Sequence, residues 1–216
     1  MHSSNNALAG QFDDLEQQHE ASSLGMWVFL ATEIMFFGGL FTGYVIFRNL
    51  DLPAFEAGSR LLNVRIGAFN TAVLLSSSLT MALAVRAAQL GKKKALVIFL
   101  LLTLLLGLTF VGAKLALEWR HDFIEGLVPG LNWTFNGPDA AHLELFFCFY
   151  FFMTGVHAAH MVVGVGILVV LIIMAGRGKF SPQRFNVVEM AGLYWHFVDI
   201  IWIFLFPLLY LIGGRY

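Results

Sequence analysis

The chain has 216 residues, of which 58% are hydrophobic and only 12% are charged, a composition outside the range of ordinary water-soluble domains. Its formal net charge of -1 and its lack of a long Lys/Arg cluster exclude a nucleic-acid-binding face, which needs concentrated positive charge. The single cysteine, Cys148, excludes an intrachain disulfide and a cysteine-based metal cluster. We therefore interpret the sequence as an integral membrane protein.

The first 23 residues form a polar, acidic segment that contains no Lys or Arg. A secretory signal peptide begins with a basic segment, so this stretch does not have the pattern of one. We expect a polar cytoplasmic tail over residues 1–23, followed by one membrane domain over residues 24–216.

Five stretches are long and apolar enough to cross a bilayer as helices. A hydrocarbon core about 30 Å thick needs roughly 20 apolar residues in helical form, because lipid cannot satisfy unpaired backbone groups. The predicted fold class is therefore all-α, an integral membrane bundle of five transmembrane helices, and the odd number puts the two termini on opposite sides. The predicted spans cover residues 24–47, 66–85, 95–113, 145–175 and 190–214.

Basic residues predict the orientation of this bundle. The short second and fourth connections together carry seven Lys or Arg residues, and the opposite side carries six in longer segments. Because cytoplasmic loops carry the excess of positive charge, we expect a cytoplasmic N terminus and a periplasmic C terminus. The third connection, predicted from Glu118 to about His142, is rich in Pro, Gly and Asn and should form an ordered external loop.

Ionisable side chains inside the predicted spans should face protein, because a carboxylate at the centre of such a helix costs about 2.5 to 3.5 kcal/mol on insertion scales. His157 and His160 are three residues apart and share one helix face. The same spacing applies to His196 and Asp199. Glu33 and Asp199 each lie about 15 Å into their spans, so they should share a level near the midplane.

These residues leave several functions open. The three histidines and a carboxylate could hold iron or zinc in the bundle core. A histidine of the fourth span and His196 could clamp a b-type haem, which would make the chain a self-contained membrane cytochrome. Buried acids and histidines could also form part of a proton path. The structural alternative is that these groups bond one another and the backbone, and the small residues in GVHAAHMVVGVG favour such close helix packing.

Other polar residues in the spans favour packing over chemistry. Ser76, Ser77 and Ser78 offer hydrogen bonds between helices. Lys114 and Glu118, at i and i+4, predict a local ion pair at the membrane edge.

The ordered motifs resemble the haem-copper oxidase subunit III family in its short five-helix bacterial form. GMWVFLATEIMFFGGLFTGY is similar to the helix that carries the membrane-buried glutamate of that family, here Glu33, and FNTAVLLSSSLT is similar to the next helix. KLALEW resembles a helix end with a second glutamate, here Glu118. FYFFMTGVHAAHMVVGVG resembles the segment with two histidines, here His157 and His160. EMAGLYWHFVDIIWIFLFPLLY resembles the last helix, with matches at Trp195, His196, Asp199 and Trp202.

This resemblance implies an accessory, non-redox subunit of a respiratory cytochrome c oxidase, which reduces dioxygen and pumps protons. The chain would be part of an enzyme complex without an active site of its own. It would bind no haem, copper or other metal, because the haems and copper belong to subunits I and II in that family. Its implied work is to support assembly, bind phospholipids and sustain proton uptake by the catalytic subunit in the bacterial cytoplasmic (inner) membrane.

The resemblance also implies partners and site residues. The partners are subunits I and II and membrane phospholipids, with a larger respiratory supercomplex left open. Subunit III of a quinol oxidase and an accessory protein of nitric oxide reductase stay open as alternatives. We expect His196 and Asp199 to be internal hydrogen-bond partners that lock the last helix against its neighbours. The candidate buried polar residues linked to protons or lipid are Glu33, Glu118, His157, His160, His196 and Asp199, and the interface aromatics are Trp195 and Trp202.

Overall fold

The computed structural model describes residues 15–136, 139–181 and 185–214, and these ranges contain helices and no strand. Five helical segments in them are long and apolar enough to span a membrane, which confirms the predicted all-α membrane bundle. Most of the predicted N-terminal tail, residues 1–14, lies outside the described residues. The helices are α1 (Leu15–Leu50), α2 (Leu52–Leu61), α3 (Val64–Gln89), α4 (Lys93–Ala113), the π-helix η1 (Lys114–Trp119), α5 (Arg120–Ile124), α6 (Ala140–Gly176) and α7 (Asn186–Tyr210).

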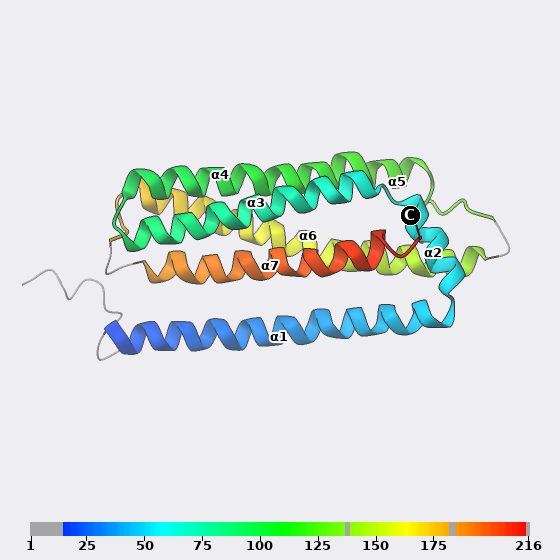
Figure 1. Ribbon diagram of the computed structural model, residues 1–216, viewed down its shortest axis with the longest axis horizontal. Coiled ribbons are helices and arrows are strands. Elements are labelled where there is room, and N and C mark those ends of the chain that lie inside the picture. Colours follow the sequence, from blue (N-terminus) through cyan, green and yellow to red (C-terminus); the bar gives the residue numbers. More distant parts are fainter. Residues whose placement is uncertain (1–14, 137–138, 182–184, 215–216) are drawn as a thin grey trace, which may run out of the picture.

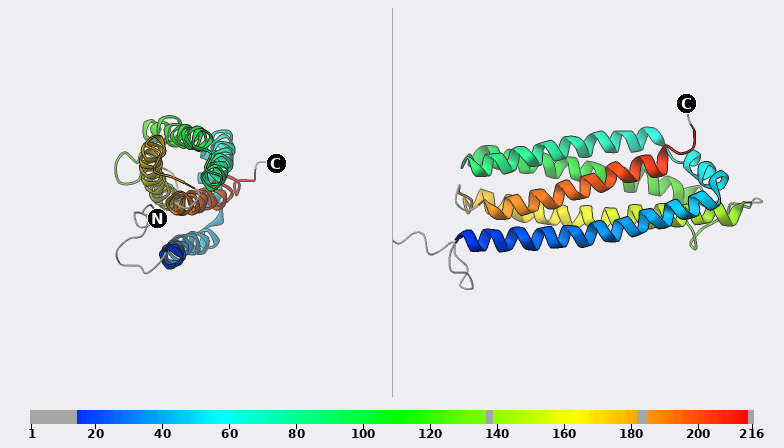
Figure 2. Two further views of the ribbon diagram at one scale, coloured as in Figure 1. Left: turned by 90° about the vertical axis from the view of Figure 1, so that its left-hand side faces the viewer. Right: turned by 60° about the horizontal axis from the view of Figure 1, so that its bottom comes forward.

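Four of the long helices, α3, α4, α6 and α7, form a bundle, and α1 runs along its outside (Figures 1 and 2). The buried side chains of α1 recur every seven residues, at Leu30, Phe37 and Tyr44. A seven-residue repeat keeps one narrow stripe of a helix against its neighbour. The Phe37 ring packs on Phe197 of α7 with ring centroids 6.3 Å apart, and the Tyr44 hydroxyl donates to the Leu208 carbonyl at 2.8 Å. Thus α1 is attached along a single stripe.

The short connections that follow α3 and α6 lie at the end of the bundle where α1 begins (Figure 1). In each, the second residue after the helix is a glycine at positive φ, Gly91 at 67° and Gly178 at 68°. After α3, the amide of Lys92 donates to the Ala87 carbonyl at 2.9 Å, and after α6 the amide of Lys179 donates to the Met174 carbonyl at 3.1 Å. These bonds close both helices with the same turn, which glycine allows because it lacks a Cβ.

The third span differs most from the sequence prediction. It was expected to end at Ala113 and to pass into a loop at Glu118, but the helix continues through η1 and α5 to Ile124. Charged residues interrupted the apolar pattern there, although Lys114 and Glu118 are buried in the bundle. Consequently, Lys114, which was one of the six basic residues counted on the side of the longer segments, lies within a helix and not in an external connection.

The ends of the other helices also differ. The first span was predicted to begin at Leu24, but α1 already begins at Leu15, and α6 begins at Ala140 within the predicted loop. The last helix ends at Tyr210 instead of Gly214. Hydropathy identifies only the apolar stretch, and a helix can extend past it into the headgroup region because its backbone bonds are internal.

Helix α2 was not predicted. It starts with Pro53 in its first turn and buries Ala54 and Phe55, while Glu56 and Arg60 form an ion pair with its charged atoms 3.6 Å apart. A short helix with one apolar and one charged side is typical of the membrane interface. Its place at the far end of α1 agrees with that level (Figure 1).

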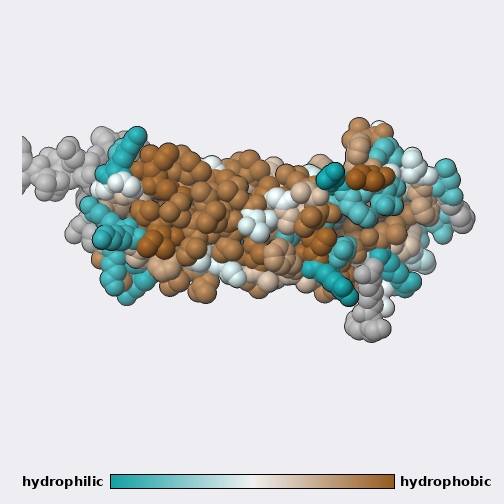
Figure 3. Space-filling view, turned by 90° about the horizontal axis from the view of Figure 1, so that it is seen from above, coloured by the Kyte–Doolittle hydropathy of each residue, from teal (hydrophilic) through white to brown (hydrophobic). Residues whose placement is uncertain are grey.

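The surface of the bundle has the polarity of a membrane protein. Figure 3 shows a broad hydrophobic band along its length, with hydrophilic residues at both ends. Large apolar side chains such as Leu105, Leu108 and Val162 are about half exposed. Because lipid tails are as apolar as these side chains, exposure of this kind carries little penalty in a bilayer. The chain is a multi-pass membrane protein.

Candidate functional site

Glu33 and His160 connect α1 to α6. The His160 Nε2 atom lies 3.1 Å from Glu33 Oε2, and Nδ1 lies 2.8 Å from the Val156 carbonyl oxygen of its own helix. A carbonyl oxygen only accepts, so Nδ1 carries a proton. One further proton then sits between Nε2 and the Glu33 carboxyl group, whichever of the two atoms holds it. Both side chains are 20% exposed, so this shared proton lies close to the surface between α1 and the bundle.

His157 lies on the same helix but has different neighbours. Its ring packs against Phe110 of α4, with centroids 5.5 Å apart, and against Trp202 of α7 at 5.3 Å. The side chain is buried, and within the described residues neither ring nitrogen has a hydrogen-bond partner. The two histidines that sequence spacing placed on one face therefore serve different contacts: His160 reaches α1, whereas His157 fills the bundle interior.

Polar residues of α7 bond a stripe of hydroxyl groups on α3. His196 Nδ1 lies 2.7 Å from Ser78 Oγ, and the Trp195 indole donates to Ser77 Oγ at 3.0 Å. Further along, the Trp202 indole donates to a threonine hydroxyl of α3, also at 3.0 Å. Trp195 and Trp202 are buried at this interface between helices. Of the three serines singled out in the sequence, Ser77 and Ser78 thus bond α7, whereas Ser76 donates to the Ala72 carbonyl of its own helix.

Asp199 does not bond His196. It is only 2% exposed, and neither of its carboxylate oxygens has a hydrogen-bond partner within the described residues. Spacing of three residues puts both side chains on one face, but the imidazole reaches Ser78 on the neighbouring helix instead. Both residues were expected to hold the last helix against its neighbours; His196 does connect α7 to α3, whereas Asp199 makes no such hydrogen bond within the described residues.

Lys114 and Glu118 form the expected ion pair, and both side chains are buried within the protein. They are 2% and 4% exposed. Lys114 Nζ also donates to the hydroxyl groups of Tyr150, at 3.0 Å, and Tyr210, at 2.6 Å. The Tyr210 hydroxyl in turn donates to Glu118 Oε2. Buried charges need such additional hydrogen bonds to offset their desolvation.

Asp122 belongs to the same cluster and was not a candidate in the sequence. It lies one helical turn after Glu118, is 5% exposed, and its Oδ2 atom lies 3.2 Å from the Tyr150 hydroxyl. The i, i+4 spacing of Glu118 and Asp122 was a usable signal. It was overlooked because Asp122 fell in the segment expected to be a loop.

The candidate residues do not converge on one centre. His157 contacts α4 and α7, His160 contacts α1, and His196 contacts α3. The three rings therefore neither surround one metal nor face each other across a haem. Across the three described ranges, no group of three or more His, Cys, Asp or Glu side chains is arranged to hold a metal ion. The arrangement links helices at several separate points.

Comparison with known proteins gives a consistent set of relatives. A family model described as cytochrome c oxidase subunit III matches residues 5–214. The chain is 31% identical to quinol oxidase subunit 3 of Bacillus spizizenii and also 31% identical to quinol oxidase subunit 3 of Bacillus subtilis, over 92% of this chain and 92% of each relative. It is 29% identical to a probable quinol oxidase subunit 3 of Staphylococcus haemolyticus, over 94% of this chain and 95% of that protein.

Proposed function

The chain belongs to the cytochrome c oxidase subunit III family and is subunit III of a haem-copper oxidase, and from this premise we propose that its oxidase takes electrons from a quinol. The names of its relatives in two bacterial genera support this choice. They favour the quinol enzyme over the cytochrome c oxidase and over the nitric oxide reductase accessory protein considered from the sequence.

The proposed role is that of a non-redox subunit beside catalytic subunits I and II in the bacterial cytoplasmic membrane. Its histidines support this, since His160 is engaged by Glu33 and His196 by Ser78. The third, His157, is packed between two aromatic rings. The polar groups thus join the helices of this chain, while its long sides are apolar and suited to lipid or to the helices of a partner subunit.

The proposed orientation has the start of α1 on the cytoplasmic side. Both short connections lie at that end and carry basic residues, among them Lys92 and Lys179 (Figure 1). The positive-inside rule assigns this end to the cytoplasm. Glu33 and His160 share a proton near the surface beside α1. Through this pair the subunit would sustain proton uptake or lipid binding.

The electron donor is tested on the intact complex. An affinity tag on this chain should co-purify a large haem-containing subunit and a second subunit, both identified by mass spectrometry. Oxygen consumption by that preparation should be driven by reduced quinol and not by reduced cytochrome c, with an untagged strain as the control. Turnover with cytochrome c alone would contradict the quinol proposal while leaving family membership intact.

The absence of a redox centre is tested by absorption spectroscopy. The purified chain, separated from its partners, should show no haem Soret band. Replacement of His157, His160 or His196 should leave the haem spectrum of the whole complex unchanged. A band that is lost with any of these histidines would establish a b-type cytochrome instead.

A further inference from the structure

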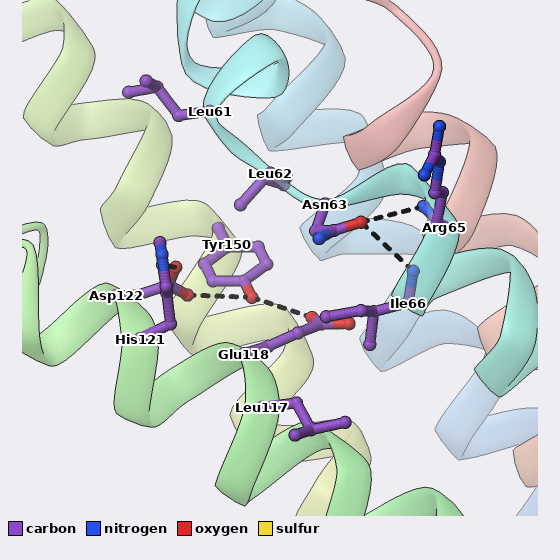
Figure 4. Close-up of a pocket in the computed structure, with 10 residues that line it drawn as sticks. All are labelled: Leu61, Leu62, Asn63, Arg65, Ile66, Leu117, Glu118, His121, Asp122 and Tyr150. Atoms are coloured by element: carbon purple, nitrogen blue, oxygen red, sulfur yellow. Dashed lines mark hydrogen bonds and ion pairs between the residues drawn. The ribbon is translucent and has the colours of Figure 1, made fainter.

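A pocket of about 460 Å³ lies where α2 meets α3, at the end of the bundle that includes α5 (Figures 1 and 4). Its volume is in the range of pockets that hold small ligands. One wall comes from the junction of α2 and α3, another from the last turns of the third span, and a third from Tyr150 of α6. Part of this lining is apolar and consists of Leu61, Leu62, Ile66 and Leu117.

The floor of the pocket is acidic. Figure 4 shows the carboxyl groups of Glu118 and Asp122 on either side of the Tyr150 hydroxyl group, which lies 3.2 Å from Glu118 Oε2 and 3.2 Å from Asp122 Oδ2. The hydroxyl has a single proton, so it can donate to only one of the two carboxylates. Lys114 is the one buried cation that contacts this pair in the described residues. The buried part of the floor thus holds one lysine against two carboxylates, and the other basic group nearby is the exposed His121 ring, whose Nδ1 atom lies 3.9 Å from Asp122 Oδ1.

The same floor is short of hydrogen-bond donors. The three N–H groups of Lys114 are directed to Glu118, Tyr150 and Tyr210. Glu118 is 4% exposed, and its second oxygen, Oε1, has no hydrogen-bond partner within the described residues, although the residue lines the pocket. A buried carboxylate oxygen without a donor is unfavourable by about 1 to 3 kcal/mol or more. The floor is therefore suited to a cationic group that donates hydrogen bonds.

The mouth of the pocket has the opposite charge. Arg65, at the start of α3, is exposed and lines the pocket. A guanidinium group binds phosphate oxygens in a planar, bidentate way. The charge of the pocket thus changes from negative at depth to positive at the rim.

We propose that this pocket binds an aminophospholipid headgroup, with its primary ammonium group on Glu118 and Asp122 and its phosphate at Arg65. The acidic floor matches the ammonium, the basic rim matches the phosphate, and the leucine-rich wall matches the start of the acyl chains. The neighbouring amphipathic helix α2 puts the pocket at the level of lipid headgroups. A metal ion fits less well, because no suitable group of three ligands exists in the described residues.

This inference deepens the lipid-binding part of the proposed function and rests on it only for the position of the chain in a membrane. It is independent of the electron donor. A negative lipid result would leave the quinol assay unaffected, and oxidation of cytochrome c would leave the lipid site unaffected.

The test uses the intact oxidase complex, stripped of loosely held lipid and titrated with lipids of matched acyl chains while native mass spectrometry counts those retained. Phosphatidylethanolamine should be retained on the order of tenfold better than phosphatidylcholine at one site, because a trimethylammonium group has no N–H to donate. Phosphatidylglycerol, which lacks a cation, should also be retained poorly. Equal retention of all three lipids would overturn the proposal.

Matched variants locate the site. Asp122→Asn should lower retention of one phosphatidylethanolamine on the order of tenfold, whereas Asp139→Asn, an exposed aspartate at the start of α6 outside the lining, should not. Arg65→Gln, on the exposed rim, should lower retention severalfold without a risk to the core, compared with Arg120→Gln as its control. Retention that is unchanged in both pocket variants, or bound water alone in a high-resolution map of the pocket, would overturn the assignment.

Discussion

The indole ring of Trp195 lies so close to Gly164 that a Cβ atom at this glycine would come within 2.9 Å of the ring. On the other side of the indole, a Cβ at Gly107 of α4 would come within 2.7 Å. With its hydrogen bond to Ser77, Trp195 therefore contacts α3, α4 and α6 at once. This one side chain thus holds α7 against three neighbouring helices.

Gly164→Ala should therefore destabilise the bundle by about 1 to 3 kcal/mol, because the added methyl group overlaps a rigid ring that is held from three sides. Thermal unfolding of the purified complex, followed by aggregation or by loss of this subunit, measures the effect. Gly166→Ala is the matched control on the same helix, since its added Cβ would meet no atom within 4 Å. Equal stability of the two variants would contradict this role of Trp195.

Two substitutions of Glu33 separate the effect of the proton that it shares with His160 from the effect of packing between the two side chains. In Glu33→Gln the amide can still donate to His160 Nε2, so assembly and thermal stability should stay within about 0.5 kcal/mol of the wild type. The amide cannot release a proton, so turnover should fall severalfold or inactivation should come sooner. Glu33→Leu should also lose the link between α1 and α6, at about 1 kcal/mol.

Oxygen consumption, the ratio of protons pumped per electron and the lifetime of the active complex are the measurements for these two variants. If Glu33→Gln matches the wild type in all three, the pair has only a packing role.

The contribution of the buried Lys114–Glu118 ion pair to stability is tested by removing one partner. Lys114→Met leaves Glu118 without its cation in the interior and should destabilise the subunit by about 3 to 5 kcal/mol. The double variant Lys114→Met/Glu118→Gln should recover part of that loss, because the carboxylate that Lys114 contacts directly is neutralised as well. Glu56→Gln on α2, which breaks an exposed pair of the same spacing, should change stability by less than about 1 kcal/mol.

Unfolding of the wild type, Lys114→Met, Glu118→Gln and the double variant in the same detergent gives the coupling energy. A double variant that is less stable than Lys114→Met would show that the cluster does not depend on charge balance.

The contact between α7 and α3 is tested at Ser78. Ser78→Ala removes the partner of His196 and should destabilise the bundle by about 0.6 to 2 kcal/mol, the range for hydrogen bonds between transmembrane helices. Ser76→Ala, two residues away, is the control, because its exposed hydroxyl donates to the Ala72 carbonyl of its own helix at 2.8 Å. The comparison needs only thermal melting of both variants; a larger effect at Ser76 would contradict the assigned contact.

The sequence by itself determined the number of spans, the membrane class and the family, because each depends on patterns within about 20 residues. It also contained the Lys114–Glu118 ion pair, since residues at i and i+4 meet on any helix. The serines of α3 were identified as hydrogen-bonding groups because a hydroxyl in hydrocarbon needs a partner nearby.

Only the tertiary structure decided which partner each buried polar group has. Sequence spacing put His157 and His160 on one face of their helix, but His157 packs inside the bundle whereas His160 reaches α1. His196 and Asp199 likewise share a face, but only His196 has a hydrogen-bond partner on a neighbouring helix within the described residues. The cluster of Asp122, Tyr150 and Tyr210 joins residues as much as 88 positions apart in the chain, counted from Asp122 to Tyr210. Spacing along a helix fixes the direction in which a side chain points, whereas its contacts depend on how other helices pack against that face, and that packing is a property of the whole bundle.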